Sequence, residues 1–241
     1  MTDNAEQKLG HKLVSRFKTR IHILEVAGTQ IQLLAPADPD ALLDDPIVEQ
    51  RYQADNYLPY WPIIWPSSLM LAERILTEEG SPPMAPAGVA MPRAIELGCG
   101  LGATGIAAAK RGWHVTFTDY DPEAIEFAAH NALRNGIPAG QIATSHMDWR
   151  TPVAEKFPWV IASDVLYERR LHALLLHAID ALLTTKGVAW ISDPQRSSAE
   201  DFPLAALEAG FKVVSMNLMG KNFADQPQAG TLYVLTRAGI K

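Results

Sequence analysis

One ten-residue segment, ELGCGLGATG from Glu96 to Gly105, restricts the fold of this chain more than any other feature. Its last six residues match the pattern G-x-G-x-x-G, in which glycines allow a ligand to approach bare backbone. An apolar run precedes the segment and an alanine-rich run follows it. We therefore expect a strand, a tight loop and a helix N-terminus that together bind a cofactor.

Strands and helices alternate regularly after residue 92. Asp121 and Pro122 supply the second helix of this region with an N-cap and a first-turn proline. The alternation predicts an α/β fold, a doubly wound Rossmann-like sheet with ligands at the carboxyl ends of its strands. We expect strands at 93–97, 114–119, 141–147, 159–165 and 187–193, helices near 103–111, 122–133, 171–182 and 199–209, and a closing antiparallel pair at 211–217 and 231–237.

The first 60 residues differ in pattern from the rest. Residues 1–20 are polar and of mixed charge, which indicates a frayed or helical lead-in. Residues 19–38 alternate apolar and polar side chains on both sides of Ala27 and Gly28, which predicts a β-hairpin. We therefore divide the chain into an N-terminal extension with a small β-hairpin, 1–60, and a cofactor-binding domain, 61–241.

Two local signals lie between the hairpin and the first strand of the alternating region. Apolar residues at helical spacing predict a helix from Ser67 onward, with Ser67 or Ser68 as its N-cap. Residues 80–92, GSPPMAPAGVAMP, have the composition of a linker.

Charge and composition narrow the partners. The net charge of −6 gives no general attraction to nucleic acid. One cysteine excludes an internal disulfide framework, and no secretory signal or membrane span is recognisable, so we expect a cytoplasmic protein. The seven histidines show no ligand spacing and Cys99 has no ligand nearby, so we expect no metal. The sequence leaves the oligomeric state open.

Glu96 and Asp119 bear on the choice of cofactor. A carboxylate at Glu96 would repel the phosphates of a dinucleotide by a few kcal/mol at an effective dielectric constant of about 20. It would attract the ammonium and sulfonium groups of S-adenosylmethionine. Asp119 ends the second strand of the domain, 19 residues after Gly100, where a carboxylate can accept hydrogen bonds from ribose hydroxyls. Asp119 fits either cofactor, or a simple helix cap, so it does not distinguish between them. The choice of S-adenosylmethionine therefore depends on Glu96.

Four segments carry a resemblance to a known family. Residues 94–121, AIELGCGLGATGIAAAKRGWHVTFTDYD, resemble the class I, seven-strand S-adenosylmethionine-dependent methyltransferases. IIWPSSLMLAERIL (63–76), MDWR (147–150) and VIASDVLYE (160–168) resemble the lysine methyltransferase branch of the methyltransferase-like proteins, relatives of the nicotinamide N-methyltransferases. The resemblance covers about residues 55–195. It implies a seven-stranded sheet with an antiparallel C-terminal strand and methylation of an amine.

The resemblance also implies roles for individual residues. Asp119 would hold the ribose, Trp149 would flank the adenine, and Asp148 would accept from the adenine amino group. Ser163 stands where relatives often have alanine. Trp65 would lie beside the cofactor, although it could also be a core aromatic, like Trp61. The complete set expected at the cofactor is Trp65, Glu96, Gly98, Cys99, Gly100, Asp119, Asp148, Trp149 and Ser163.

The acceptor side is expected in the sequence DVLYE. A lysine with a pKa near 10.4 is neutral in about one molecule in 2,500 at pH 7, a handicap of roughly 4.6 kcal/mol. Asp164 and Tyr167, three residues apart at a strand end, could orient the amine, with Asp164 expected ahead of Tyr167, although they could also merely cap the next helix. Asp193 and Arg196 would shape the acceptor entrance or form an ordinary turn.

The sequence therefore favours an S-adenosylmethionine-dependent N-methyltransferase that acts on a protein lysine. The alternatives are methylation of a small amine or heterocycle, a NAD-linked oxidoreductase, and a cofactor-binding scaffold without catalysis.

Overall fold

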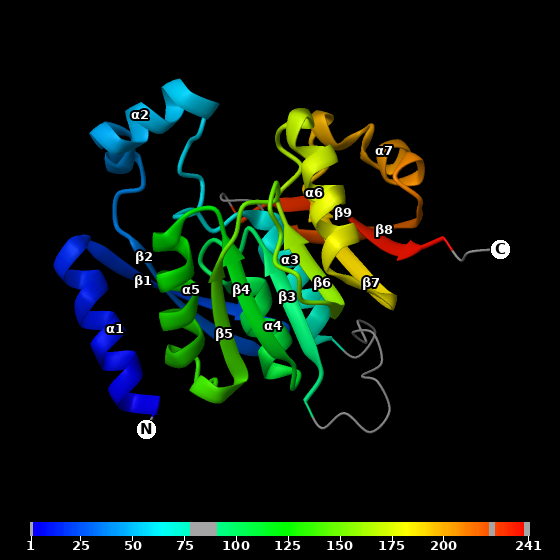
Figure 1. Ribbon diagram of the computed structural model, residues 1–241. Helices are drawn as coiled ribbons and strands as arrows, with labels where there is room; N and C mark the ends of the chain where they lie inside the picture. Colours follow the sequence, from blue (N-terminus) through cyan, green and yellow to red (C-terminus); the bar gives the residue numbers. More distant parts are fainter. Residues whose placement is uncertain (1, 78–90, 222–224, 239–241) are drawn as a thin grey trace.

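The centre of the molecule is a mixed β-sheet. The computed structural model describes residues 2–77, 91–221 and 225–238, and within these residues a seven-stranded sheet has the order β5-β4-β3-β6-β7-β9-β8 (Figure 1). The first five strands in this order, β5, β4, β3, β6 and β7, are parallel to one another. β9 pairs antiparallel with both β7 and β8. The strands are β3 (Arg93–Leu97), β4 (His114–Asp119), β5 (Ile142–His146), β6 (Phe157–Ser163), β7 (Leu183–Asp193), β8 (Phe211–Lys221) and β9 (Pro227–Arg237).

This arrangement confirms the expected fold class. The chain order moves outward from β3 to β5 and then returns to β6, so the carboxyl ends of β3 and β6 meet at the point where the strand order reverses. β3 and β6 are in register from Ala94 opposite Trp159 to Leu97 opposite Ala162. Such central strands are nearly all apolar because helices cover both faces of a parallel sheet.

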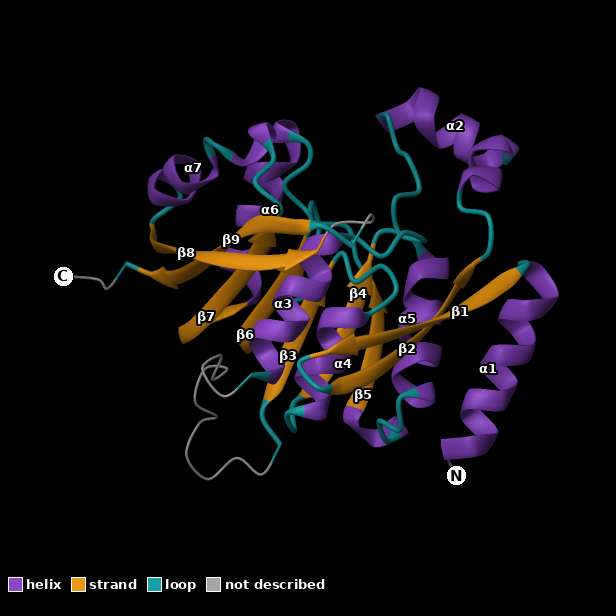
Figure 2. Cartoon of the chain, turned by 180° about the vertical axis from the view of Figure 1, so that it is seen from behind, coloured by secondary structure: helices purple, strands orange, loops and turns teal. Residues whose placement is uncertain are grey.

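Helices cover the two faces in separate groups. α3 (Pro66–Leu76), α4 (Ala103–Lys110) and α5 (Pro122–Arg134) lie on one face, seen in front of the sheet in Figure 2. α6 (Arg169–Leu182) and α7 (Phe202–Glu208) pack on the other face with their own buried cluster. Short 3₁₀ turns occupy Asp40–Asp44, Ala139–Gln141 and Ser197–Ala199. Among the residues that the structure describes, no helix is both long and apolar enough to cross a membrane.

The N-terminal hairpin is held to the domain by amide side chains. β1 (Thr19–Val26) and β2 (Thr29–Pro36) pair antiparallel, as predicted, and α1 (Thr2–Arg16) precedes them beside α5. On α5, Asn131 accepts from the Leu34 backbone N–H (2.7 Å) and donates to the Leu34 carbonyl (3.0 Å). One turn later Asn135 makes the same pair of bonds to Gln32 (3.0 and 2.7 Å). The two asparagines therefore bind β2 as a neighbouring strand would.

The α2 helix (Pro46–Asp55) stands away from this body (Figure 1). None of its residues is buried. Polar and ring contacts hold its C-terminal end instead. Arg51 lies over the ring of Tyr57 (3.5 Å to the centroid), Tyr57 donates to Asp121, and Tyr120 donates to Asp55 (3.2 Å).

The local expectations differ from the structure in a few places. α3 begins at Pro66 with Trp65 as the N-cap, so the prediction of Ser67 or Ser68 was wrong; a proline in the first turn sets the start instead. β7 begins at Leu183, directly after α6. The expected linker at 80–92 lies almost entirely outside the described residues.

Candidate functional site

A pocket opens at the carboxyl ends of the parallel strands, where the fold places ligands. Its cavity has a volume of about 240 Å³, and its walls come from the glycine loop, the ends of β4 and β6, the segment before α3 and the start of α6. Of the residues expected at the cofactor, together with Asp164 and Tyr167, all except Glu96 line it, whereas Asp193 and Arg196, expected at the entrance, do not. The structure therefore brings together ten residues that span positions 65 to 167.

The glycine loop forms the floor of the pocket. Gly98 and Gly100 have positive φ angles (+64° and +51°), which side chains rarely adopt. A Cβ on Gly98 would lie 3.1 Å from Val165 Cγ1, and one on Gly100 would lie 3.2 Å from the Trp61 carbonyl oxygen. Cys99 between them is buried, and this burial raises the pKa of its thiol well above the usual range. The loop thus presents backbone at a place where a side chain does not fit.

Glu96 lies beneath this loop and does not line the pocket. Its side chain is buried, and Oε2 accepts a hydrogen bond from the Gly105 backbone N–H in α4 (3.0 Å). Burial raises the pKa of Glu96 well above its ordinary value. Glu96 is therefore not placed to touch a ligand in the pocket, and its charge does not explain which cofactor the pocket binds. The Glu96 carboxylate instead links β3 to the first turn of α4 through this hydrogen bond.

Asp119 lies at the rim of the floor, where it was expected. Its Oδ2 accepts from the Gly100 N–H (3.0 Å) and its Oδ1 accepts from the Asp121 N–H (3.0 Å). Desolvation raises the pKa of Asp119, while these backbone donors act in the opposite direction. The carboxylate is fixed to the loop and each oxygen keeps a further lone pair for a ligand hydroxyl.

Asp148 and Trp149 form the wall beyond β5. The Asp148 carboxylate accepts from the Arg150 backbone and from its guanidinium, with the closest contact at 2.6 Å. These bonds lower the pKa of Asp148. Asp148 is therefore charged but already paired, and Trp149 supplies an apolar ring to the same wall.

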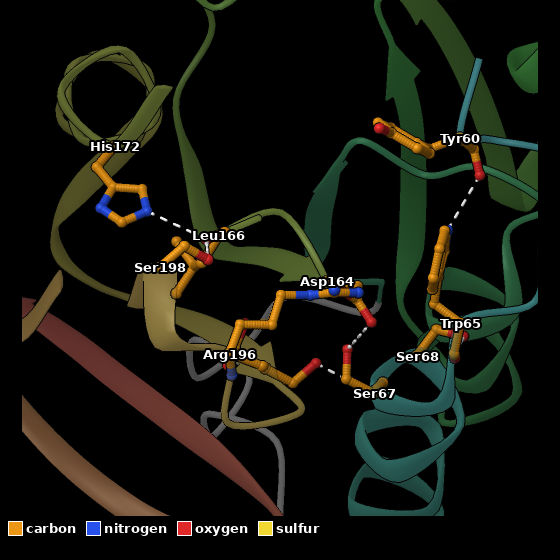
Figure 3. Close-up of polar contacts among 11 residues, drawn as sticks. Tyr60, Trp65, Ser67, Ser68, Asp164, Leu166, His172, Arg196 and Ser198 are labelled. Carbon is orange, nitrogen blue, oxygen red and sulfur yellow. Dashed lines mark hydrogen bonds and ion pairs between the residues drawn. The ribbon is translucent and has the colours of Figure 1, made fainter. Parts of the chain in front are cut away.

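Aromatic side chains line the end of the pocket that is formed by the segment before α3 and the turn after β6. The rings of Tyr60 and Tyr167 meet edge to face at 5.2 Å between centroids, and Tyr60 and Trp65 meet in the same way at 6.1 Å. The Trp65 indole N–H donates to the Tyr60 carbonyl (3.0 Å), as Figure 3 shows. Burial raises the pKa of Tyr167 above its ordinary value, so its phenol is neutral at physiological pH. Ser163 receives a hydrogen bond from Thr104 (3.3 Å).

Asp164 also lines this end, but its carboxylate has partners on both oxygens. Ser67 donates to Oδ2 (3.0 Å), and the Arg196 guanidinium donates to Oδ1 through Nε (2.8 Å) and Nη2 (2.5 Å). Asp193, expected at the entrance, is fully buried, does not line the pocket, and accepts from the Arg196 N–H (2.7 Å).

Sequence reasoning missed several residues of this end. Tyr60 lines the pocket although it lies outside the four segments that carry the resemblance, and Ser67 binds Asp164 although it was expected only as a helix cap. Ser67 and Asp164 are 97 positions apart, so no local spacing could have connected them. The only usable signal was the aromatic content of YLPYWPIIW before α3.

The pocket fits S-adenosylmethionine by the chemistry of its lining. The cradle without side chains at Gly98 and Gly100 gives room for a ligand on the backbone, and the fixed carboxylate of Asp119 suits ribose hydroxyls. The charged residues of the lining are Asp55, Asp119, Asp148, Asp164, Glu168, Arg150 and Arg170. Acidic groups thus exceed basic ones, which favours a cationic ligand over a phosphorylated one.

Comparison with known proteins gives a family match. A sequence model described as lysine methyltransferase matches residues 61–209. The electron transfer flavoprotein beta subunit lysine methyltransferase of Xenopus laevis is 29% identical over 150 residues, 61% of this chain and 56% of that protein. Protein N-lysine methyltransferase METTL21A of Danio rerio is 31% identical over 129 residues, 50% of this chain and 58% of that protein. The chain spans about half the length of these relatives.

Solved structures share the fold at lower identity. A TehB-like SAM-dependent methyltransferase from Corynebacterium glutamicum aligns over 83% of this chain and 100% of its own, with 17% identity and a TM-score of 0.51. The ribosomal protein L11 methylase of Lactobacillus delbrueckii subsp. bulgaricus aligns over 72% of this chain and 79% of its own, with 24% identity and the same TM-score.

Proposed function

The chain belongs to the lysine methyltransferase family, and from this premise we propose that it transfers a methyl group from S-adenosylmethionine to a lysine side chain of another protein. The main support is the pocket, whose lining combines the glycine floor, Asp119 and the ring of Tyr167. The named relatives methylate lysine in proteins, as their names state. The same single buried cysteine, Cys99, supports a cytoplasmic site of action.

We propose that the floor and the far wall hold the cofactor. When bound, S-adenosylmethionine supplies a methyl group whose carbon an amine lone pair can attack, while the carbon–sulfur bond breaks and the sulfonium becomes a neutral thioether. The backbone at Gly98, Cys99 and Gly100 would lie against its amino acid end, and Asp119 would accept from the ribose hydroxyls. The residues that would enclose its remaining parts are Trp65, Asp148, Trp149 and Ser163.

Tyr167 is the proposed acceptor-orienting residue. The lysine must present a lone pair, and the aromatic surroundings of Tyr60 and Tyr167 exclude water, which lowers the pKa of an entering amine. The neutral Tyr167 hydroxyl can accept from, or donate to, that amine. The Arg196 guanidinium already neutralises the carboxylate of Asp164, which favours Tyr167 over Asp164 for direct contact, in the reverse of the order expected from the sequence.

A radiolabel-transfer assay, followed by mass spectrometry of the labelled peptides, tests this function. Purified protein is incubated with labelled S-adenosylmethionine and a cell lysate, the acid-precipitated protein is counted, and labelled peptides are sequenced. We expect one or more methyl groups on lysine with the wild type and strongly reduced transfer with Tyr167→Phe, which removes only the hydroxyl. Label that stays entirely in the acid-soluble fraction would instead identify a small amine as the acceptor.

Binding of the cofactor is tested separately by calorimetry with S-adenosylhomocysteine. Asp119→Ala removes the carboxylate that both ribose hydroxyls would share, so we expect affinity to fall about ten-fold or more. The surface variant Glu155→Ala serves as control, because Glu155 pairs with Arg93 at the beginning of β3 and does not line the pocket. A thermal shift with NAD but none with S-adenosylhomocysteine would contradict the proposal.

A further inference from the structure

Asp164 is a buried carboxylate that is held by Ser67 at the start of α3 and by Arg196 in the turn after β7 (Figure 3). Its side chain is 2% exposed and its φ angle is +56°, in the left-handed region that non-glycine residues seldom adopt. It directly follows β6, where Ser67 of α3 donates to one oxygen and Arg196 donates twice to the other. Such a residue keeps its conformation only where its surroundings enforce it.

Arg196 contacts two walls of the pocket without lining it. Its guanidinium binds Asp164, and its Cζ atom lies 5.2 Å from the centroid of the Trp65 ring, within the range of a cation–π contact. Its backbone N–H donates to Asp193 at the end of β7, which fixes the root of the side chain. Asp164 and Trp65 line the pocket, whereas Arg196 is not part of the lining.

We infer that Arg196 is a positioning residue, which fixes the turn at Asp164 and the ring of Trp65 relative to each other. This inference rests on the proposed function, because it assumes that the pocket is the site of methyl transfer. Removing one partner of a buried ion pair leaves an uncompensated charge, so loss of the guanidinium would release the Asp164 turn. Tyr167, three residues further along the same turn, would then lose its alignment.

A spectroscopic experiment tests the contact without any acceptor. The protein is labelled with 5-fluorotryptophan, and the Trp65 fluorine resonance is assigned by its loss in Trp65→Phe. We expect this resonance to shift in Arg196→Met. The matched control is Arg93→Met, because Arg93 also pairs with a carboxylate and lies over a ring, Phe157, but in an exposed pair. An unchanged Trp65 resonance in Arg196→Met would overturn the inference.

Thermal unfolding tests the charge pairing. Arg196→Met should lower Tm by about 6–12 °C, the range expected when a buried pair in a chain of this size is broken. Adding Asp164→Asn should recover most of this loss, since it removes the unpaired charge, and it keeps the test readable where Arg196→Met alone folds poorly. A double variant no more stable than Arg196→Met would contradict the pairing.

Transfer rates distinguish positioning from stability alone. Measured well below Tm, Arg196→Met should incorporate label into lysate protein about ten-fold or more slowly, since small misalignments are costly. Arg196→Lys should recover part of the rate. A wild-type rate in Arg196→Met would overturn the inference. Failure of the proposed function looks different: the wild type itself then labels no lysine, while the fluorine and Tm results still decide the contact.

Discussion

Gly105 lies in the first turn of α4, and among the glycines of the loop and this turn it leaves the least room for a side chain. A Cβ at this position would lie 2.4 Å from Phe117 Cε1 and 2.5 Å from Glu96 Oε2, distances that real Cβ atoms do not show. The last glycine of the G-x-G-x-x-G pattern is thus required by helix–strand packing, while Gly98 and Gly100 serve the pocket. The single motif therefore combines two separate constraints.

Gly105→Ala should destabilise the fold by about 1–3 kcal/mol, because the added methyl group forces Phe117 and Glu96 to move. Chemical denaturation measures the free energy of unfolding. Gly140→Ala is the matched control, since no atom lies within 4 Å of its added Cβ and we expect almost no loss. Equal effects of the two substitutions would disprove the packing argument.

Asp193 makes the stability depend on pH. Desolvation raises the pKa of its carboxyl from 3.8 to about 6, with Asp164 adding to this rise and Arg196 opposing it. Between these two pH values the folded state binds more protons than the unfolded state, so stability falls as pH rises. Relative to Asp193→Asn, the wild type should lose up to about 3 kcal/mol between pH 4 and pH 7. Urea titrations of both proteins at several pH values measure the difference, and a constant difference would contradict the prediction.

At the level of elements, α5 links the hairpin to the cofactor loop. Asn131 is fully buried, and besides its two bonds to Leu34 it donates to the Leu101 carbonyl (3.0 Å), whose residue lines the pocket. One side chain therefore satisfies backbone groups from β2 and from the loop after β3. The extension and the site are connected through a helix that touches both.

Asn131→Ala should destabilise the protein by about 2–4 kcal/mol, because three buried backbone groups lose their partner. Hydrogen exchange should show faster exchange at the Leu34 amide and along β2. Asn217→Ala is the control, as Asn217 is exposed on β8. Unchanged protection of β2 in Asn131→Ala would refute the role of this bond network.

The elements of the sheet were predictable because each is encoded by local periodicity and turn residues. The glycine loop and Asp119 were predictable because strand ends converge in this fold. The clamp of Asn131 on Leu34 and the bond from Ser67 to Asp164 were not, since both join residues 97 positions apart. Glu96 was misinterpreted for a related reason: its position in the sequence does not reveal that its side chain points under the loop.

At the level of the whole molecule, the N-terminal extension completes the core. Leu13, Ile31 and Leu33 are fully buried in the same cluster as the helices on that face, and Phe17 meets Phe127 edge to face at 5.5 Å. The division at residue 60 follows the sequence pattern, whereas the packing crosses it.

A chain of residues 61–241 should therefore not fold stably. Each large buried side chain contributes about 1.5–3 kcal/mol, so the loss approaches the total stability of a typical domain. Differential scanning calorimetry would show a weak transition or none. A cooperative transition close to that of the full chain would contradict this expectation.

The α2 segment supplies a wall of the pocket, Asp55 to Leu58, although the helix itself buries nothing. Displacing it costs only the polar and ring contacts of its C-terminal end, so we expect these contacts, and not the stability of the sheet, to limit the residence time of bound S-adenosylhomocysteine. Arg51→Ala should speed release of S-adenosylhomocysteine in stopped-flow measurements and leave Tm unchanged, and an unchanged release rate would argue against this. We therefore expect turnover and thermal stability to depend on different parts of the chain, so that substitutions can alter one and preserve the other.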